Sequence, residues 1–141
     1  KRSAPGIFGR LGIPDMPEPD VCTSAEEILK YQWLVRQVPV SETVNRFAVD
    51  LVRATRPADP EAPEIVRKYI KFGSSVRATM FLTLAAKARA LMEGRYHVTT
   101  DDIRALALPI LRHRVLANYY AESDGKTVDD VLRAMIESRP G

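Results

Sequence analysis

The chain has 141 residues, of which 45% are hydrophobic and 28% charged, and its formal net charge is +3 at pH 7. This composition is typical of one globular domain with a real core and excludes a disordered chain. The charge is small and its basic residues are scattered, so it does not indicate nucleic acid by itself, and no apolar run approaches the roughly 20 residues of a membrane span. The single cysteine, Cys22, excludes an internal disulfide and favours a reducing, cytoplasmic setting. With only two histidines there is no zinc pattern.

Residues 1–22 contain three of the seven glycines and four of the ten prolines, without sustained periodicity. We expect irregular chain here, either a linker or the end of a preceding region. The chain starts at Lys1, with no initiator methionine and none of the features of a signal peptide. We therefore expect a piece of a longer protein, with a helical domain over residues 23–141.

Two helices are predicted at the start of that domain. Ser24 and Glu27 form an S-x-x-E capping box, and Pro39 ends the helix that follows. Ser41 can cap a second helix that ends near Arg56. The apolar residues of this second helix keep the spacing of one buried stripe: Val44, Phe47, Ala48, Leu51, Val52 and Thr55.

A proline-rich loop over 57–63 and a short helix over 63–69 are expected next. Ser75 is the predicted N-cap of a third long helix, which runs to about Glu93, with Gly94 as the left-handed residue after its end. This helix has the most apolar face in the chain.

Two further capping boxes mark the last two predicted helices. Thr99 with Asp102 starts one helix, in which Pro109 is expected to bend the axis or loosen a turn, and Thr127 with Asp130 starts the terminal helix. Alternation with a period of two is confined to one three-residue stretch, so the β content should be negligible. The predicted fold is all-α, a small bundle of about five to six helices.

Arg77 is the residue whose placement says most about function. It stands in the first turn of the third long helix, and at roughly 100° per residue it falls on that helix's apolar face. The apolar residues that share this face are Phe81, Leu84, Ala85, Ala88, Leu91 and Met92. An unpaired buried guanidinium is costly, so Arg77 needs an anionic partner. That partner is either a carboxylate elsewhere in the fold or an anion beyond the end of the bundle.

Other motifs were weighed and mostly rejected. Gly125-Lys126-Thr127 is similar to the end of a phosphate-binding loop, but Tyr120 stands where that motif needs a glycine, and we interpret the segment as a turn and helix cap. The loop from Gly94 to the next helix is interpreted as a corner packed by Tyr96 and Val98. No nucleophile elbow, paired carboxylates on one face or H-E-x-x-H helix is found, so no catalytic residue is assigned.

A helical DNA-binding domain is a further alternative, because the pI is about 9.2 and basic residues occur on one predicted helix. These residues are Arg104, Arg112, His113 and Arg114. The same helix opens with two aspartates that would face phosphate, which disfavours a helix-turn-helix reader of DNA. No nucleic-acid partner is expected.

Six segments between residues 54 and 114 form one ordered pattern: 54–56, 73–78, 85–91, 93–95, 98–103 and 111–114. Together they resemble the C-terminal lid domain of MoxR-type AAA+ ATPases. The resemblance covers about residues 24–136 and is most specific over 73–114. Residues 1–22 match nothing in that family.

The resemblance implies roles for several residues. In that family the arginine of the G-x-S-x-R-A segment is the sensor 2 residue, so Arg77 is expected to contact the γ-phosphate of ATP, with Ser75 as a second candidate nucleotide contact. The family usually has proline before that arginine, whereas this chain has Val76. Proline fixes its backbone near the helical conformation, so with valine the first turn, and Arg77 with it, is less preorganised. His113 and Arg114 match the family as candidates for an interface with the core or a neighbouring subunit, and Arg114 is equally able to bridge an internal carboxylate.

The resemblance also implies what lies outside this sequence. The phosphate-binding loop, the metal-binding acidic motif, sensor 1 and the arginine finger belong to an N-terminal α/β core, so this chain alone should not hydrolyse ATP. ATP and Mg²⁺ are expected as cofactors of the full-length parent. The expected parent is a chaperone-like remodelling ATPase. The expected partners of this chain are that core, neighbouring subunits of a homo-oligomeric, hexameric ring, and von Willebrand factor A domain proteins. The alternative is a stand-alone helical interaction module in which Arg77 only bridges a carboxylate.

Overall fold

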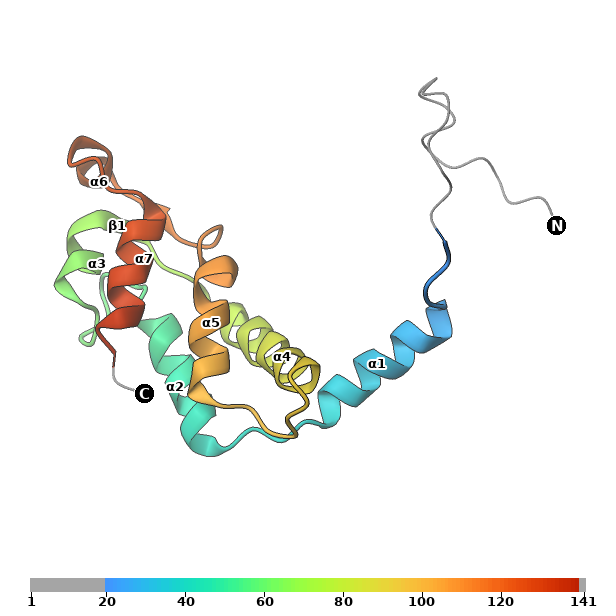
Figure 1. Cartoon of the computed structure of the whole chain (residues 1–141). Coiled ribbons are helices and arrows are strands. Elements are labelled where there is room, and N and C mark those ends of the chain that lie inside the picture. Colours follow the sequence, from blue (N-terminus) through green and yellow to red (C-terminus); the bar gives the residue numbers. More distant parts are fainter. Residues whose placement is uncertain (1–19, 140–141) are drawn as a thin grey trace, which may run out of the picture.

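The computed structural model describes residues 20–139, which form seven helices and two short strands (Figure 1). The elements are α1 (Ala25–Gln37), α2 (Glu42–Arg53), α3 (Glu64–Tyr69), β1 (Ile70–Phe72), α4 (Arg77–Met92), α5 (Thr100–Leu111), β2 (Leu116–Ala117), α6 (Tyr119–Ser123) and α7 (Val128–Glu137). The predicted all-α class is confirmed. The predicted irregular segment 1–22 falls mostly outside the described residues, so the domain boundary stays a prediction.

Most helix starts follow from local capping chemistry. Capping boxes are present at the starts of α1, α5 and α7, formed by the pairs Ser24–Glu27, Thr99–Asp102 and Thr127–Asp130. The hydroxyl of Ser41 accepts a hydrogen bond from the N–H of Val44 at 3.3 Å, which caps α2. Helix α2 ends at Arg53, three residues earlier than predicted, because Thr55 and Arg56 turn the chain there. Pro109 lies inside α5, which continues through it to Leu111.

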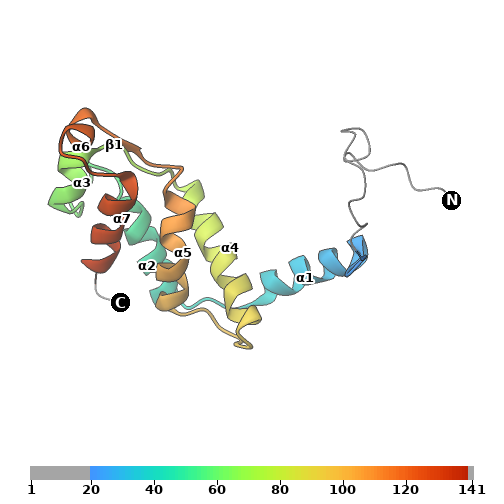
Figure 2. The same ribbon diagram turned by 45° about the horizontal axis from the view of Figure 1, so that its top comes forward.

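The core lies where α2, α4 and α5 pack against one another, with α7 against α5 and α3 (Figure 2). Small residues let the helices approach closely, because an alanine leaves room for the neighbouring backbone. The fully buried residues of α2, α4, α5 and α7 include Ala48, Leu51, Ala78, Leu82, Ala86, Ala90, Ile103, Ala107, Leu111, Val131, Leu132 and Met135.

A buried carboxylate holds the corner between α4 and α5. Asp102 is 1% exposed and accepts hydrogen bonds from Arg95 at 2.6 and 2.8 Å and from the N–H of Thr99 at 2.9 Å. These donors, Arg95 above all, hold the pKa of Asp102 well below its usual range, although burial opposes them. The Nε atom of Arg89 lies 3.2 Å from the same carboxylate.

Part of the predicted corner was wrong. Gly94 has φ 71° and ends α4 as predicted, and Val98 is buried. Tyr96, however, is 82% exposed and does not pack there. The ion pair between Arg95 and Asp102 anchors the loop instead, and no sequence pattern had indicated it.

A two-stranded antiparallel sheet joins the chain after α3 to the chain after α5. Ile70 pairs with Ala117, and the N–H of Asn118 donates to the carbonyl of Tyr69 at 2.9 Å. The side chain of Asn118 then caps the short helix α6. These elements were not predicted, because strands this short carry no measurable alternation. The turn at Gly125, with φ 63°, and the cap at Thr127 were predicted and are confirmed.

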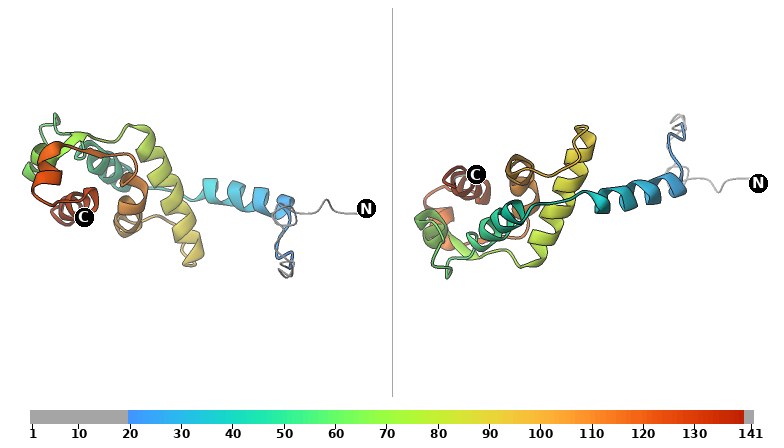
Figure 3. Two further views of the ribbon diagram at one scale, coloured as in Figure 1. Left: turned by 90° about the horizontal axis from the view of Figure 1, so that it is seen from above. Right: turned by 90° about the horizontal axis from the view of Figure 1, so that it is seen from below.

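Helix α1 extends away from the other helices in every view (Figure 3). None of its residues is buried, and its side chains leave a large apolar surface open: Ile28, Leu29, Tyr31, Trp33 and Leu34. Its C-terminal end lies beside α4, where Lys87 donates a hydrogen bond to the carbonyl of Arg36 at 3.1 Å. A 13-residue helix is marginal without tertiary packing, so this surface is suited to contact another protein region.

Candidate functional site

Arg77 is the first residue of α4, and its side chain is exposed at that end of the bundle. Within residues 20–139 its guanidinium forms no salt bridge and no hydrogen bond. The predicted alternative, an internal carboxylate partner, is therefore not found in the described part of the chain. The cation is available to an anion from outside the domain.

The face of α4 that carries Arg77 is not the packing face, which corrects the prediction from the helical wheel. The buried stripe is Ala78, Leu82, Ala86 and Ala90, whereas Phe81 and Leu84 on the predicted face are 46% and 43% exposed. Helix α4 is apolar on nearly all sides, so periodicity alone could not tell which side would be buried. Three of the four buried residues are alanines, which permit the close approach of α5, whereas Phe81 and Leu84 remain partly exposed on the other side.

Ser75 is not the N-cap of α4, contrary to the prediction. Val76 occupies that position and makes no side-chain cap hydrogen bond. The carbonyl of Ser75 accepts the N–H of Ala78 at 3.0 Å, and its side chain is exposed. Ser75 thus lies two residues before Arg77 at the same end of the bundle, where a nucleotide contact stays a prediction.

A groove of about 650 Å³ runs along the exposed face of α4. Its wall on α4 includes Phe81, Leu84 and Ala88, and residues of α1 and of the chain at the end of α5 close the other sides. Phe81 is one helical turn after Arg77, so the groove continues the surface on which the sensor candidate lies. The groove is mostly apolar, with basic groups from Arg36, His113 and Arg114 at its edge.

Arg114 and His113 lie beside this groove, near the N-terminal end of α4. Arg114 donates to the carbonyl of Ile110 at 2.7 Å and lies 5.2 Å from the ring centre of Phe81, and its Nη1 also contacts His113 Nε2. It thereby satisfies one of the last carbonyls of α5. Arg114 therefore bridges no carboxylate within residues 20–139, and an interface role for the pair stays a prediction.

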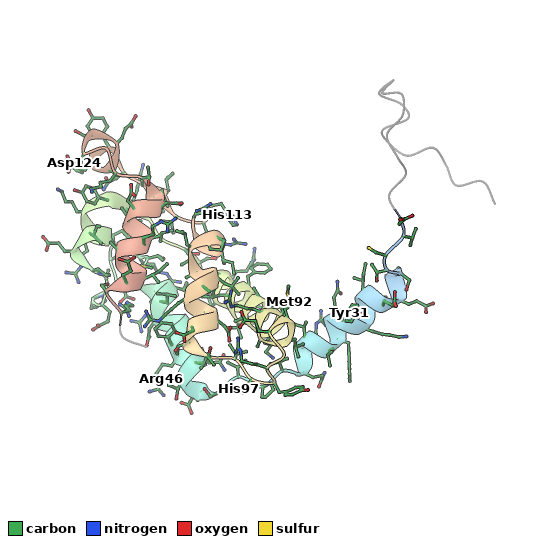
Figure 4. All side chains as sticks on the ribbon, viewed as in Figure 1. Tyr31, Arg46, Met92, His97, His113 and Asp124 are labelled. Carbon is green, nitrogen blue, oxygen red and sulfur yellow. The ribbon has the colours of Figure 1, made fainter. Side chains whose placement is uncertain are left out.

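Neither a cluster of potential metal ligands nor a helix of membrane-spanning length occurs among the described residues. Figure 4 shows that His97 and His113 lie at opposite ends of α5, and no group of three potential metal ligands occurs in residues 20–139. No helix in the same range is long and apolar enough to cross a membrane.

The basic residues that motivated a DNA-binding alternative are mostly used internally. Arg104 donates to the carbonyls of Ile136 and Arg139 at 3.3 and 2.6 Å. Arg112 pairs with Asp129. Two of the three arginines therefore have partners within the domain, which weakens the case for DNA recognition.

Comparisons with known proteins agree with this architecture. A family model described as "AAA lid domain" matches residues 62–135. A crystal structure of a proposed ATPase from Cytophaga hutchinsonii superposes with a TM-score of 0.75 at 32% identity, over 82% of this chain and 35% of that one. The family model covers more than half of the chain, so the chain belongs to the AAA lid domain family.

Two curated relatives narrow the type of lid. The chain is 26% identical to "Chaperone MoxR1" of Mycobacterium tuberculosis, over 94% of this chain and 35% of the relative. It is 36% identical to "Protein MoxR" of Methylorubrum extorquens, over 60% of this chain and 25% of the relative. The chain is thus a lid of the MoxR-type AAA+ ATPases, and it spans about a third or less of the length of these relatives.

Proposed function

We propose that this lid reads the phosphate state of ATP bound by an N-terminal AAA+ core of the same polypeptide, and that Arg77 is its sensor 2 residue. The observation that carries the proposal is the exposed guanidinium at the start of α4, which has no partner within residues 20–139. A planar, permanently charged fork suits phosphate oxygens. ATP and Mg²⁺ would be held by the core, and this chain would supply one cation to the γ-phosphate.

Contact with the γ-phosphate would bias the orientation of the whole lid. A ligand shifts a conformational equilibrium only through its different affinity for the two states, and Arg77 provides that difference if it reaches the phosphate in one lid position only. The exposed apolar surface of α1 supports the proposal because it leaves room for a second domain to pack beside the lid. ATP hydrolysis would then be coupled to movement of a rigid body.

The wider setting is also proposed. Subunits would assemble into a homo-oligomeric ring, a hexamer, with His113 and Arg114 as candidate contacts to the core or a neighbour. A chaperone-like remodelling activity is supported by the name of the relative MoxR1. Von Willebrand factor A domain proteins are proposed partners from the family resemblance. A cytoplasmic location is supported by the lone thiol of Cys22, which suits a reducing compartment.

The test is Arg77→Ala in the full-length ATPase. Loss of a hydrogen bond to a charged group, about 1.5–3 kcal/mol, should lower ATP turnover about ten- to hundredfold. Arg46→Ala is the matched control, because Arg46 is an exposed arginine on α2 whose one ion pair within residues 20–139 is with Glu42, one turn away. Thermal unfolding of the 141-residue chain should be the same for both variants. Unchanged turnover in Arg77→Ala would refute the sensor role.

The groove along α4 favours a second candidate function, a helical interaction module without a nucleotide role. The two functions differ in what precedes the lid in the gene. A G-x-x-x-x-G-K-[ST] loop encoded upstream supports the ATPase lid, because that loop binds the phosphates of ATP. An upstream region without it would support the module.

A further inference from the structure

The segment that leads into α4 is held by the end of α2. Ser74 is 2% exposed, and its N–H donates to the hydroxyl of Thr55 at 2.8 Å. The Nε atom of Arg56 donates to the carbonyl of Ser74 at 3.0 Å. The backbone N–H and C=O of Ser74 are therefore both bound by side chains of the turn that directly follows α2. We call Thr55 and Arg56, with the backbone of Gly73 and Ser74 that they hold, the α2 clamp.

Two members of the clamp, Thr55 and Gly73, are held in place by the turn after α2. Thr55 is fully buried, and its hydroxyl donates to the carbonyl of Val52 at 2.7 Å, so its oxygen is oriented to accept from Ser74. Gly73 lies against the same turn so closely that a Cβ would be 2.4 Å from the carbonyl oxygen of Thr55 and 2.7 Å from the Cα of Arg56. Any side chain would clash with this turn, so only glycine fits at this position.

The start of α4 has no cap of its own that could replace these contacts. Val76, its N-cap residue, makes no side-chain hydrogen bond and is 69% exposed. On the other side of Arg77, Ala78 is fully buried in the core. Arg77 therefore lies between two fixed points, the clamp three residues before it and the packed Ala78 immediately after it.

We propose that Thr55 and Arg56 are positioning residues for Arg77: the α2 clamp sets where the exposed guanidinium stands, so that it meets phosphate without first ordering its backbone. This inference rests on the proposed sensor role. It assigns a function to Thr55, Arg56 and Gly73. Preorganised donors act without reorganisation during the reaction, and small misplacements lower rates strongly.

The test is a double-mutant cycle on ATP turnover in the full-length ATPase, with Arg56→Ala, Arg77→Ala and the double variant. Arg56→Ala should lower kcat about tenfold, with a smaller change in KM for ATP. In the Arg77→Ala background, Arg56→Ala should have no further effect, because it acts through the absent guanidinium. Arg53→Ala is the matched control: this neighbouring arginine pairs with Asp59 at 2.9 Å and not with the clamp, so turnover should not change.

The possible outcomes of this cycle separate the positioning inference from the sensor role. If Arg77→Ala lowers ATP turnover and Arg56→Ala does not, the positioning inference is refuted and the sensor role remains. The same conclusion follows if the fold-loss of turnover in the double variant equals the product of the two single losses. Normal turnover in Arg77→Ala overturns the sensor role and the positioning inference together.

If Arg56→Ala does not fold, Thr55→Val and Thr55→Ser replace it. Valine keeps the shape of Thr55 but removes the acceptor of the Ser74 N–H, whereas serine retains it. In the 141-residue chain, Thr55→Val should speed hydrogen exchange at the amide of Ser74 and Thr55→Ser should restore protection. In the full-length ATPase, Thr55→Val should lower ATP turnover and Thr55→Ser should retain it. Equal turnover in the two Thr55 variants, both folded, would refute the inference.

Discussion

Asp102→Asn is the substitution whose effect on stability follows most directly from the structure. The side chain keeps its shape, but the carboxylate loses its charge and one of its oxygens becomes an NH₂ group. That group then faces the donors of Arg95 or Thr99, which lie within 2.6–3.0 Å of the carboxylate oxygens. A buried anion that serves several donors is replaced by an amide that satisfies only some of them.

The expected loss is about 3 kcal/mol. Removing one partner of a buried ion pair costs about 3–5 kcal/mol, and the lower end applies here because the uncompensated arginines can regain water. The side chains of Arg95 and Arg89 are 30% and 41% exposed. For a domain of this size the loss corresponds to a fall in Tm of about 10 °C. Urea unfolding of the 141-residue chain, followed by far-UV circular dichroism, measures it.

Asp101→Asn is the control, because Asp101 is the exposed neighbour in the same first turn of α5 and its loss changes the net charge equally. It should lower stability by about 0.3–1 kcal/mol through the helix dipole alone. Equal urea midpoints for the two variants would refute the reasoning that the α4–α5 corner depends on the buried carboxylate.

The pH dependence gives a second check on the same carboxylate. The pKa of Asp102 is lowered in the folded state, so its contribution is fully present above the unfolded pKa of about 3.9 and is lost as the pH falls from there through the folded pKa. The difference between wild type and Asp102→Asn should therefore be constant from pH 7 to about pH 4 and shrink below it. A gap that already closes between pH 7 and pH 5 would contradict the lowered pKa.

Two further predictions concern the ends of the domain. Thr127→Ala should lower the free energy of unfolding by about 1 kcal/mol, because the hydroxyl that accepts the N–H of Asp130 at 3.1 Å is lost; urea unfolding measures this, with the exposed Thr43→Ala as control. Trp33, the single tryptophan, is 64% exposed on α1, so its fluorescence should be that of a solvated indole in this chain and shift to shorter wavelength in the full-length ATPase. An unshifted spectrum would show that this face of α1 does not pack on the core.

The features that could be predicted from the sequence are those decided within one turn of chain. The capping box of Ser24 with Glu27 joins residues three apart, so its chemistry is visible in the sequence and its outcome hardly depends on the rest of the fold. The same holds for Gly94, whose positive φ ends α4. The buried stripe of α2 was also predicted, because polar residues on its other face leave one choice of packing side.

The features that could not be predicted depend on contacts across the fold. Arg95 reaches Asp102 around a corner, and Arg56 reaches the carbonyl of Ser74 eighteen residues away, so no spacing rule indicates either pair. The packing side of α4 was predicted wrongly for a related reason. The side was selected by which residues allow α5 to approach, a property of both helices together, and a wheel drawn for α4 alone contains no information about α5.

These long-range contacts give α4 a mechanical property that bears on the proposed sensor. The α2 clamp holds the chain just before its first turn, the Arg95–Asp102 pair ties the chain just after its last turn to α5, and buried alanines fix its middle. A pull on Arg77 by phosphate therefore meets a helix that is anchored to α2 at one end and to α5 at the other. Because packed cores resist continuous deformation, the force should move α2, α4 and α5 together and should not bend α4. Under the proposed sensor role, contact of this one guanidinium with phosphate would in this way change the orientation of the whole lid.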